Sequence, residues 1–173
     1  MRFTLYAALA ALTLSPLPAL AQNAKPTDPQ IAHIAYTAGQ LDIEAAKQAL
    51  KKSKNKEVRA FADDMVKDHS AVNKQALALV KKLKVTPQDN PTSQALTKQA
   101  AAKRAELAKL SGAAFDKAYV DNEVAYHKTV NGALASTLIP SAHNAELKSL
   151  LQTGLALFKE HQAHAEMLAA KLK

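Results

Sequence analysis

Apolar residues recur at three- and four-residue steps along most of the chain after residue 28, and this spacing predicts amphipathic α-helices. The pattern is clearest in the second predicted helix, whose apolar stripe runs through Val58, Phe61, Ala62, Met65, Val72, Ala76, Leu79, Val80 and Leu83. The sequence lacks the alternation of β-branched residues that predicts strands, and alanine, leucine, lysine and glutamine dominate it. We therefore predict an all-α protein.

Turn-forming residues divide this pattern into four long helices. They are predicted over residues 29–52, 56–86, 93–139 and from about residue 144 to the end. Within the third, Ser111-Gly112 predicts a bend or break, because glycine inside a helix costs about 1 kcal/mol relative to alanine. Each apolar stripe must be buried against its neighbours, so four such helices joined by short links predict a four-helix bundle.

The first 21 residues have the layout of a secretory signal peptide. A single Arg2 precedes a mainly apolar run, two prolines follow, and Ala19-Leu20-Ala21 places small residues where a signal peptidase reads them. We expect cleavage after Ala21, which leaves a single helical-bundle domain over residues 22–173. A membrane anchor would need about 20 uninterrupted apolar residues. We therefore expect a periplasmic or secreted protein with no transmembrane segment in its mature chain.

Composition narrows the range of partners. The chain has 23 lysines and arginines against 15 acidic residues, a formal net charge of +8 that falls to +7 when the signal peptide leaves. Many lysines end predicted helices, where cations complement the helix dipole; contact of a basic surface with anionic envelope components is the alternative. Aromatic residues are scarce, so we expect no nucleic-acid partner. The sequence has no cysteine, so disulfides and thiolate metal sites are excluded. The composition does not determine the oligomeric state.

Histidines interrupt the apolar stripes of three predicted helices. His69 lies four residues after Met65 on the second helix, and His127 and His161 each lie three residues from an apolar position on the third and fourth. Carboxylates accompany them within a helical turn, and the first helix offers one at the edge of its own stripe. Every predicted helix can thus direct a metal-type ligand toward the interior.

Imidazole and carboxylate groups are the side chains that iron, manganese, zinc and copper accept from helices. The candidate metal-ligating residues are Glu44, Asp68, His69, Glu123, His127 and His161. Glu123 and His127 stand four residues apart, one more than in the Glu-x-x-His motif of di-iron bundles, yet this spacing still puts both side chains on one helix face. The alternative is that the histidines are neutral core residues with ordinary hydrogen-bond partners.

Four segments resemble an exported bacterial family labelled domain of unknown function four-one-four-two. They are GQLDIEAAKQAL at 39–50, FADDMVKDHS at 61–70, SGAAFDKAYVDNEVAYH at 111–127 and LFKEH at 157–161. The resemblance extends from about residue 30 to residue 168, and it implies export, a ferritin-like fold and metal binding without supplying a reaction. The matching positions are Glu44, Phe61, Met65, Asp68, His69, Phe115, Asp116, Tyr119, His127 and His161.

Glu123 departs from this family pattern, because glutamine or methionine is more usual at its position.

The sequence leaves three functions open. We expect an exported bundle that binds one or two transition-metal ions in its core; the alternative is a non-catalytic envelope or stress-related protein whose histidines form hydrogen bonds only. An acid–base enzyme that uses Asp116 or Glu123 with His127 has no nucleophile motif or glycine-rich loop in support, so a conventional enzyme is not favoured.

Overall fold

The computed structural model describes residues 25–172, and the predicted signal peptide lies outside this range. Nearly all of these residues are helical and none forms a strand, so the all-α prediction is confirmed. None of the helices in this range has both the length and the apolar character of a membrane span. The elements are α1 (Asp28–Lys52), α2 (Lys56–Lys82), α3 (Pro91–Ala108), α4 (Gly112–Ala133), the π-helical η1 (Leu134–Leu138), α5 (Ile139–Ser141) and α6 (Ala145–Lys171).

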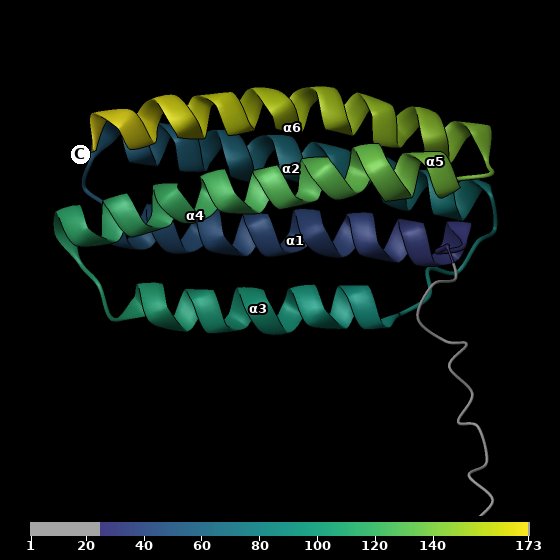
Figure 1. Cartoon of the computed structure of the whole chain (residues 1–173), viewed down its shortest axis with the longest axis horizontal. Coiled ribbons are helices and arrows are strands. Elements are labelled where there is room, and N and C mark those ends of the chain that lie inside the picture. Colours follow the sequence, from purple (N-terminus) through teal and green to yellow (C-terminus); the bar gives the residue numbers. More distant parts are fainter. Residues whose placement is uncertain (1–24, 173) are drawn as a thin grey trace, which may run out of the picture.

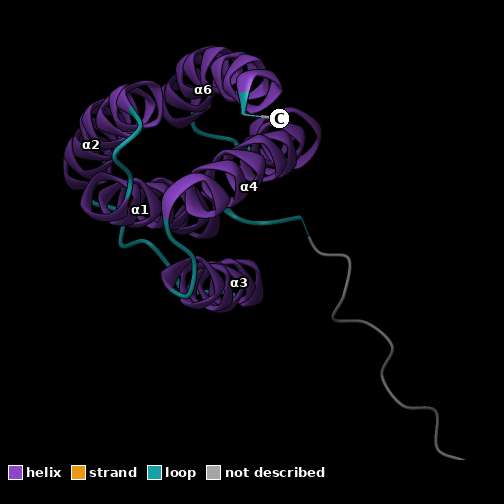
Figure 2. Cartoon of the chain, turned by 90° about the vertical axis from the view of Figure 1, so that its left-hand side faces the viewer, coloured by secondary structure: helices purple, strands orange, loops and turns teal. Residues whose placement is uncertain are grey.

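Four long helices surround a shared interior, and a fifth lies outside it. α1, α2, α6 and α4 contact one another in that order around the interior, and α3 packs against the outer side of α1 (Figures 1 and 2). Successive long helices run in opposite directions. The described part of the chain thus has five long helices where the apolar pattern predicted four.

The additional helix arises where a bend or break was predicted. α3 ends at Ala108 and α4 begins at Gly112, whose φ of +56° lies in the left-handed region that favours glycine. The chain reverses direction here, so the predicted third helix becomes two antiparallel helices. Its apolar spacing continues on both sides of Gly112, and this spacing alone cannot distinguish a bend from a reversal.

Asparagine side chains and one aspartate fix the helix ends. Asn55 and Asn144 each accept hydrogen bonds from two backbone N–H groups in the first turn of α2 and α6, which satisfies donors that have no partner within the helix. The Asp28 carboxylate accepts from the backbone N–H groups of His143 and Asn144, both at 2.8 Å. The start of α1 is thereby tied to the start of α6.

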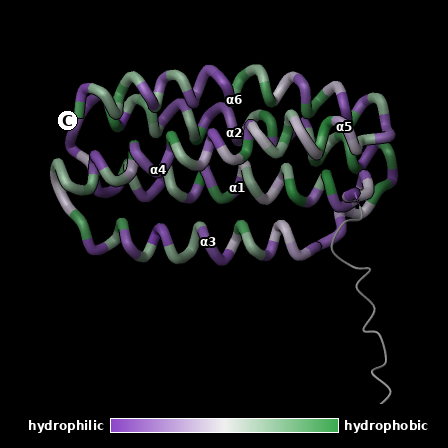
Figure 3. The backbone as a smooth tube through the Cα atoms, in the orientation of Figure 1, coloured by the Kyte–Doolittle hydropathy of each residue, from purple (hydrophilic) through white to green (hydrophobic). Residues whose placement is uncertain are grey.

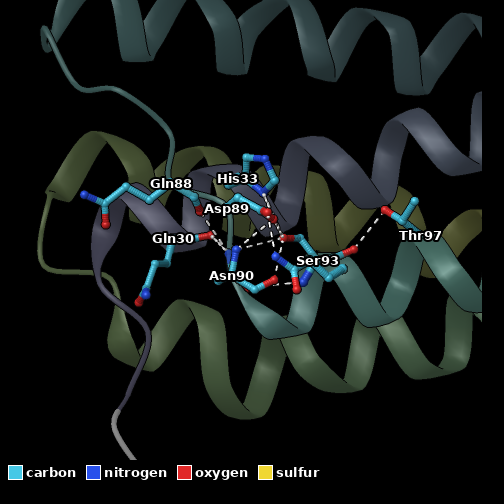
Figure 4. A network of polar contacts seen from close by, with 8 residues as sticks. Gln30, His33, Gln88, Asp89, Asn90, Ser93 and Thr97 are labelled. Carbon is cyan, nitrogen blue, oxygen red and sulfur yellow. Dashed lines mark hydrogen bonds and ion pairs between the residues drawn. The ribbon is translucent and has the colours of Figure 1, made fainter.

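Polar contacts hold the link between α2 and α3 against α1 (Figure 4). The His33 Nδ1 lies 2.9 Å from the Ser93 hydroxyl, and the Asn90 side-chain amide donates to the Gln30 carbonyl at 3.4 Å. Ser93 N–H in turn donates to Asn90 Oδ1 at 3.1 Å. Asn90 and Ser93 are buried, so these bonds satisfy groups that would otherwise be costly to bury.

The core differs between the two ends of the helix array. Figure 3 shows apolar and polar positions interspersed along every long helix, in keeping with one buried face on each. At the end that holds the start of α4, large side chains are fully buried in close contact; they include Phe61, Met65, Phe115, Tyr119 and Val120. At the opposite end, the core is lined mainly by aliphatic residues and encloses a cavity of about 780 Å³.

A pair of glycine variants tests the reversal at Gly112. Gly112→Ala should lower the free energy of unfolding by about 1–2 kcal/mol, because a left-handed conformation strains a residue with a Cβ. No atom lies within 4 Å of the added carbon, so conformational strain is the main effect. Gly132→Ala is the matched control near the end of α4, where the helical backbone continues into η1. The added methyl group also meets nothing there and should raise stability by about 1 kcal/mol. Urea unfolding followed by circular dichroism measures both, and shifts of the same sign would contradict the backbone argument.

Candidate metal centre

Three imidazole rings from three helices meet midway along the interior. His69 comes from α2, His127 from α4 and His161 from α6, and the distances between their ring centroids are 5.7 Å for His69–His127, 5.3 Å for His69–His161 and 5.6 Å for His127–His161. All three residues are buried. The structure therefore brings together the three histidines that the sequence placed on apolar stripes.

Asp42 on α1 completes the cluster, and sequence reasoning missed it. Its Oδ2 lies 3.3 Å from His69 Nε2 and 3.5 Å from His127 Nε2, and its side chain is fully buried. Asp42 lies four residues after Ala38 and four before Ala46, which are both buried on α1. The test that identified His69, a polar residue in register with an apolar stripe, would have found Asp42 as well.

Glu123 fixes the orientation of the His127 ring. The Nδ1 of His127 lies 3.0 Å from the Glu123 carbonyl oxygen, which can only accept, so Nδ1 carries the proton. The lone pair then resides on Nε2, which faces Asp42. The Glu123 carboxylate is buried on the same helix face, with Oε2 3.6 Å from the His127 ring.

Asp68 lies behind His161. The Nε2 of His161 donates to Asp68 Oδ2 at 3.1 Å, so the lone pair of this ring resides on the buried Nδ1. The Asp68 side chain is partly exposed between α2 and α6. It therefore acts on the cluster through His161, since a carboxylate that accepts from one ring nitrogen makes the other a better ligand.

Glu44 is not part of the cluster. Its Oε2 forms an ion pair with Arg104 Nη1 at 2.7 Å, and its side chain is 41% exposed between α1 and α3. Glu44 follows Asp42 by two positions, which corresponds to about 200° around an α-helix. When Asp42 faces the interior, Glu44 must face away from it.

The centre contains an unusual concentration of buried polar atoms that have no hydrogen-bond partner among residues 25–172. Seven of them belong to the cluster: Asp42 Oδ1 and Oδ2, His69 Nδ1 and Nε2, His127 Nε2, Glu123 Oε2 and His161 Nδ1. Each such atom typically costs about 1–3 kcal/mol. Native proteins keep few of them, so seven at one place call for a specific explanation.

Two overlapping groups of side chains could hold an ion. His69, His127 and His161 form one, and Asp42, Glu123 and His127 form the other; within each group, one ligand atom per residue lies within 4.8 Å of the others. Ligands at about 2.0–2.1 Å from a tetrahedral ion are about 3.4 Å apart. Small side-chain rotations would bring these atoms to that separation. Because His127 belongs to both groups, they outline one centre.

Burial sets the protonation of these groups. It raises the pKa of Asp42 to about 7, and burial followed by the Asp42 charge raises the pKa of Glu123 well above its ordinary value. It also lowers the pKa of His127 to about 4 and, together with the two other rings, lowers the pKa of His69. The imidazoles are therefore neutral near pH 7, which is the form that binds metal ions.

The resemblance seen in the sequence is confirmed by comparison with known families. The family described as Domain of unknown function (DUF4142) matches residues 14–168. This chain belongs to the DUF4142 family. No curated protein matches it.

Two solved structures resemble this DUF4142 protein. A protein of Streptomyces coelicolor, described as secreted and named for DUF305, aligns with a TM-score of 0.70 and 12% identity over 83% of this chain and 91% of its own. CopM in its Cu(II)-bound form aligns with a TM-score of 0.65 and 15% identity over 87% of this chain and 100% of its own. At these identities the likeness shows a shared fold.

Because the pKa of Asp42 is raised in this DUF4142 protein, removing its charge should increase the free energy of unfolding, and the increase should depend on pH. The unfolded chain ionises Asp42 near the ordinary pKa of 3.8, whereas the folded chain does so at about 7, so folding is penalised increasingly between these values and fully above pH 7. In buffer that contains a chelator, Asp42→Asn should raise the free energy of unfolding by a few kcal/mol at pH 8, since one pKa unit corresponds to about 1.4 kcal/mol.

This gain should shrink as the pH falls toward 5, because the parent then folds with Asp42 protonated. Urea unfolding of both chains at several pH values between about 5 and 8 measures the difference. A difference that does not change with pH would contradict the assignment of Asp42 as a buried, uncompensated carboxylate.

Proposed function

We propose that this DUF4142 protein is an exported metal-binding protein that holds one transition-metal ion between His69, His127, His161 and Asp42. The observation that carries this proposal is a cluster of buried, unpartnered nitrogen and oxygen atoms on these residues, with ligand atoms that lie within 4.8 Å of one another in two groups that share His127. A cation bound there would accept lone pairs from all four helices that surround the interior. It would also compensate the carboxylate charge that burial otherwise disfavours.

The groups around the ligands support this proposal. The Glu123 carbonyl and the Asp68 carboxylate each take the proton-bearing nitrogen of one histidine, His127 and His161. In both rings the remaining lone pair then belongs to a buried nitrogen in the cluster. Hydrogen bonds of this kind are the usual outer layer of a metal site, because they fix the tautomer and the direction of the ring.

The ligand types favour copper or zinc over the other candidates. Three imidazoles with one or two carboxylates suit copper, zinc, iron or nickel, whereas manganese prefers more oxygen ligands. Copper(II) stands highest among these divalent ions in intrinsic affinity. CopM, which shares the fold, was solved with Cu(II) bound, and this adds reason to test copper first and zinc second.

Export and domain organisation belong to the same proposal. The predicted signal peptide over residues 1–21 supports export, as does the fold shared with a protein described as secreted. We take residues 22–173 as a single domain in which α1, α2, α4 and α6 form a ferritin-like four-helix bundle. In this description α3 is an addition on its outer side.

A purely structural role for the histidines explains less of the geometry. Ordinary hydrogen bonds account for one nitrogen each of His127 and His161. Both nitrogens of His69 and both oxygens of Asp42 lack a partner among the described residues. The structural alternative therefore leaves the centre of the cluster unexplained, whereas a bound ion uses the lone pair of one His69 nitrogen and an oxygen of Asp42.

Metal content after expression without a histidine tag tests the proposal. We expect about one copper or zinc ion per parent chain, and at least a ten-fold loss in His69→Ala and in His127→Ala, because each removes a ligand from the centre. His143→Ala is the matched control, since His143 is exposed at the start of α6 and should leave the content unchanged. Elemental analysis of folded samples measures this, and a parent chain that takes up none of copper, zinc, iron or manganese would refute the proposal.

Variants of Asp68 and Glu44 test whether Asp68 affects metal affinity through its hydrogen bond to His161 or only through its negative charge. Asp68→Ala should weaken metal affinity about 10- to 100-fold without changing the stoichiometry, as loss of a carboxylate behind a histidine ligand typically does. Glu44→Ala removes the same charge from a residue that pairs with Arg104 and should leave affinity unchanged. Competition with a chromogenic chelator measures both. Equal losses in the two variants would show that Asp68 acts only through its charge.

A further inference from the structure

The cavity of about 780 Å³ reaches the proposed metal centre. Asp42, His69 and His127 line one end of it, and Pro26 and Leu147 line the other. Its walls come from α1, α2, α4, η1 and α6, with the start of α3 at the far end. The volume falls within the range of about 300–1,000 Å³ that is typical of small-molecule sites.

Small residues create this space. Alanines and glycines occupy wall positions on α1, α2, α4 and α6; they are Ala32, Ala35, Ala38, Gly39, Ala76, Ala133 and Gly154. At the opposite end of the core, α2 and α4 have the aromatic residues Phe61, Phe115 and Tyr119 instead. The π-helical η1 also lies in the wall, through Leu134 and Leu138, and π-helical turns are frequent at functional sites. Protein interiors are otherwise close-packed, and a cavity of this size lowers stability unless something fills it.

The shape of the cavity is elongated. Gln30 and Asp42 both line it and are twelve residues apart on α1, which corresponds to about 18 Å along a helix. Thr92 and Thr137, which also belong to its lining, are exposed. The cavity thus reaches solvent away from the cluster. An elongated ligand could enter there and place its leading end at the cluster.

The charges along the wall restrict the polar end of such a ligand. The lining contains no lysine or arginine, and Asp42 is its single acidic residue. In the proposed ligand set, three imidazoles and the Asp42 carboxylate leave a divalent ion with one uncompensated positive charge. Glu123, whose Oε2 lies 3.6 Å from His127 Nδ1, is outside this set and does not line the cavity. In an apolar interior that charge favours an anionic oxygen ligand over a neutral or cationic group.

We propose that this cavity binds an elongated apolar molecule with one terminal carboxylate, of the fatty-acid class, whose carboxylate ligates the metal ion beside Asp42, His69 and His127. This inference rests on the proposed metal centre, since no other cationic group in the lining could compensate the carboxylate. The apolar walls between the cluster and the solvent-exposed threonines would cover the chain. The metal centre then serves as the anchor of a small-molecule site.

Binding of dodecanoate to metal-loaded and metal-free protein, measured by titration calorimetry, tests this inference. We expect saturable binding of one molecule, at least ten-fold tighter to the metal-loaded form, and at least ten-fold tighter than binding of dodecanol or dodecyltrimethylammonium. Affinity should fall about four-fold for each methylene removed from the chain. In the Cu(II)-loaded protein, dodecanoate should also change the electron paramagnetic resonance spectrum, because a new oxygen joins the ion, whereas dodecanol should not.

Two phenylalanine variants on α2 test whether dodecanoate binds in the cavity or on the protein surface. Ala76 lines the cavity, whereas Ala78, two positions along, is exposed and does not. Ala76→Phe should weaken dodecanoate binding at least ten-fold with metal content unchanged, and Ala78→Phe should alter it by less than two-fold. Equal effects of the two variants would overturn the location.

The spectroscopic comparison on the parent chain stands even if Ala76→Phe fails to fold. A metal-loaded parent that does not bind dodecanoate, or binds dodecanol equally well with no spectral change, overturns the inference and leaves the proposed metal centre intact. A parent chain that binds no metal refutes the proposed function itself and removes the anchor. Metal content, measured first on the same samples, distinguishes the two failures.

Discussion

The organisation of this protein depends on the burial of five ionisable side chains, Asp42, His69, Glu123, His127 and His161, at one point in a helical interior. Removing such groups from water without partners opposes folding by several kcal/mol. The chain reduces this cost by shifting protons, since burial raises the pKa of the carboxyl groups and lowers that of the imidazoles. The cluster without a cation is therefore close to neutral, and its lone pairs remain available.

The surrounding core fixes the positions of these groups. The His69 ring stacks on Phe158 with a centroid distance of 4.5 Å and an interplanar angle of 14°, and the Asn131 side-chain amide donates to the Phe158 carbonyl at 3.1 Å. The aromatic contact connects α2 to α6 beside the cluster, and the hydrogen bond connects α4 to α6. At the end where α4 begins, the rings of Phe115 and Tyr119 stack, and this close-packed core provides apolar burial that offsets the polar centre.

Local patterns were sufficient for the helices and for the histidines, because both are expressed in spacing along one helix. Stripe positions identified His69, His127 and His161, and Gly112 marked the break. Asp42 also lies on an apolar stripe, whereas Glu44, the predicted ligand on the same helix, lies at the stripe edge and matches the family. The role of Asp68 could not be predicted, because it depends on how α2 and α6 meet. The reversal at Gly112 likewise depends on contacts between helices, since Ser111-Gly112 is compatible with a bend in one helix as well as with a turn between two.

The cavity could not be predicted from the sequence for a related reason. Alanine on an apolar stripe indicates burial whether the helices close around it or stand apart, so the stripe predicts Ala76 as an ordinary core residue. Only the assembled helices show that small side chains from several of them face one space, and that this space ends at His69 and Asp42. A polar centre at the boundary between a packed core and a hollow one is accessible from one direction. A bound ion there would be coordinated by four helices and would still present a face to the cavity, which is the arrangement needed for an ion to bind a ligand as well as to stabilise the fold.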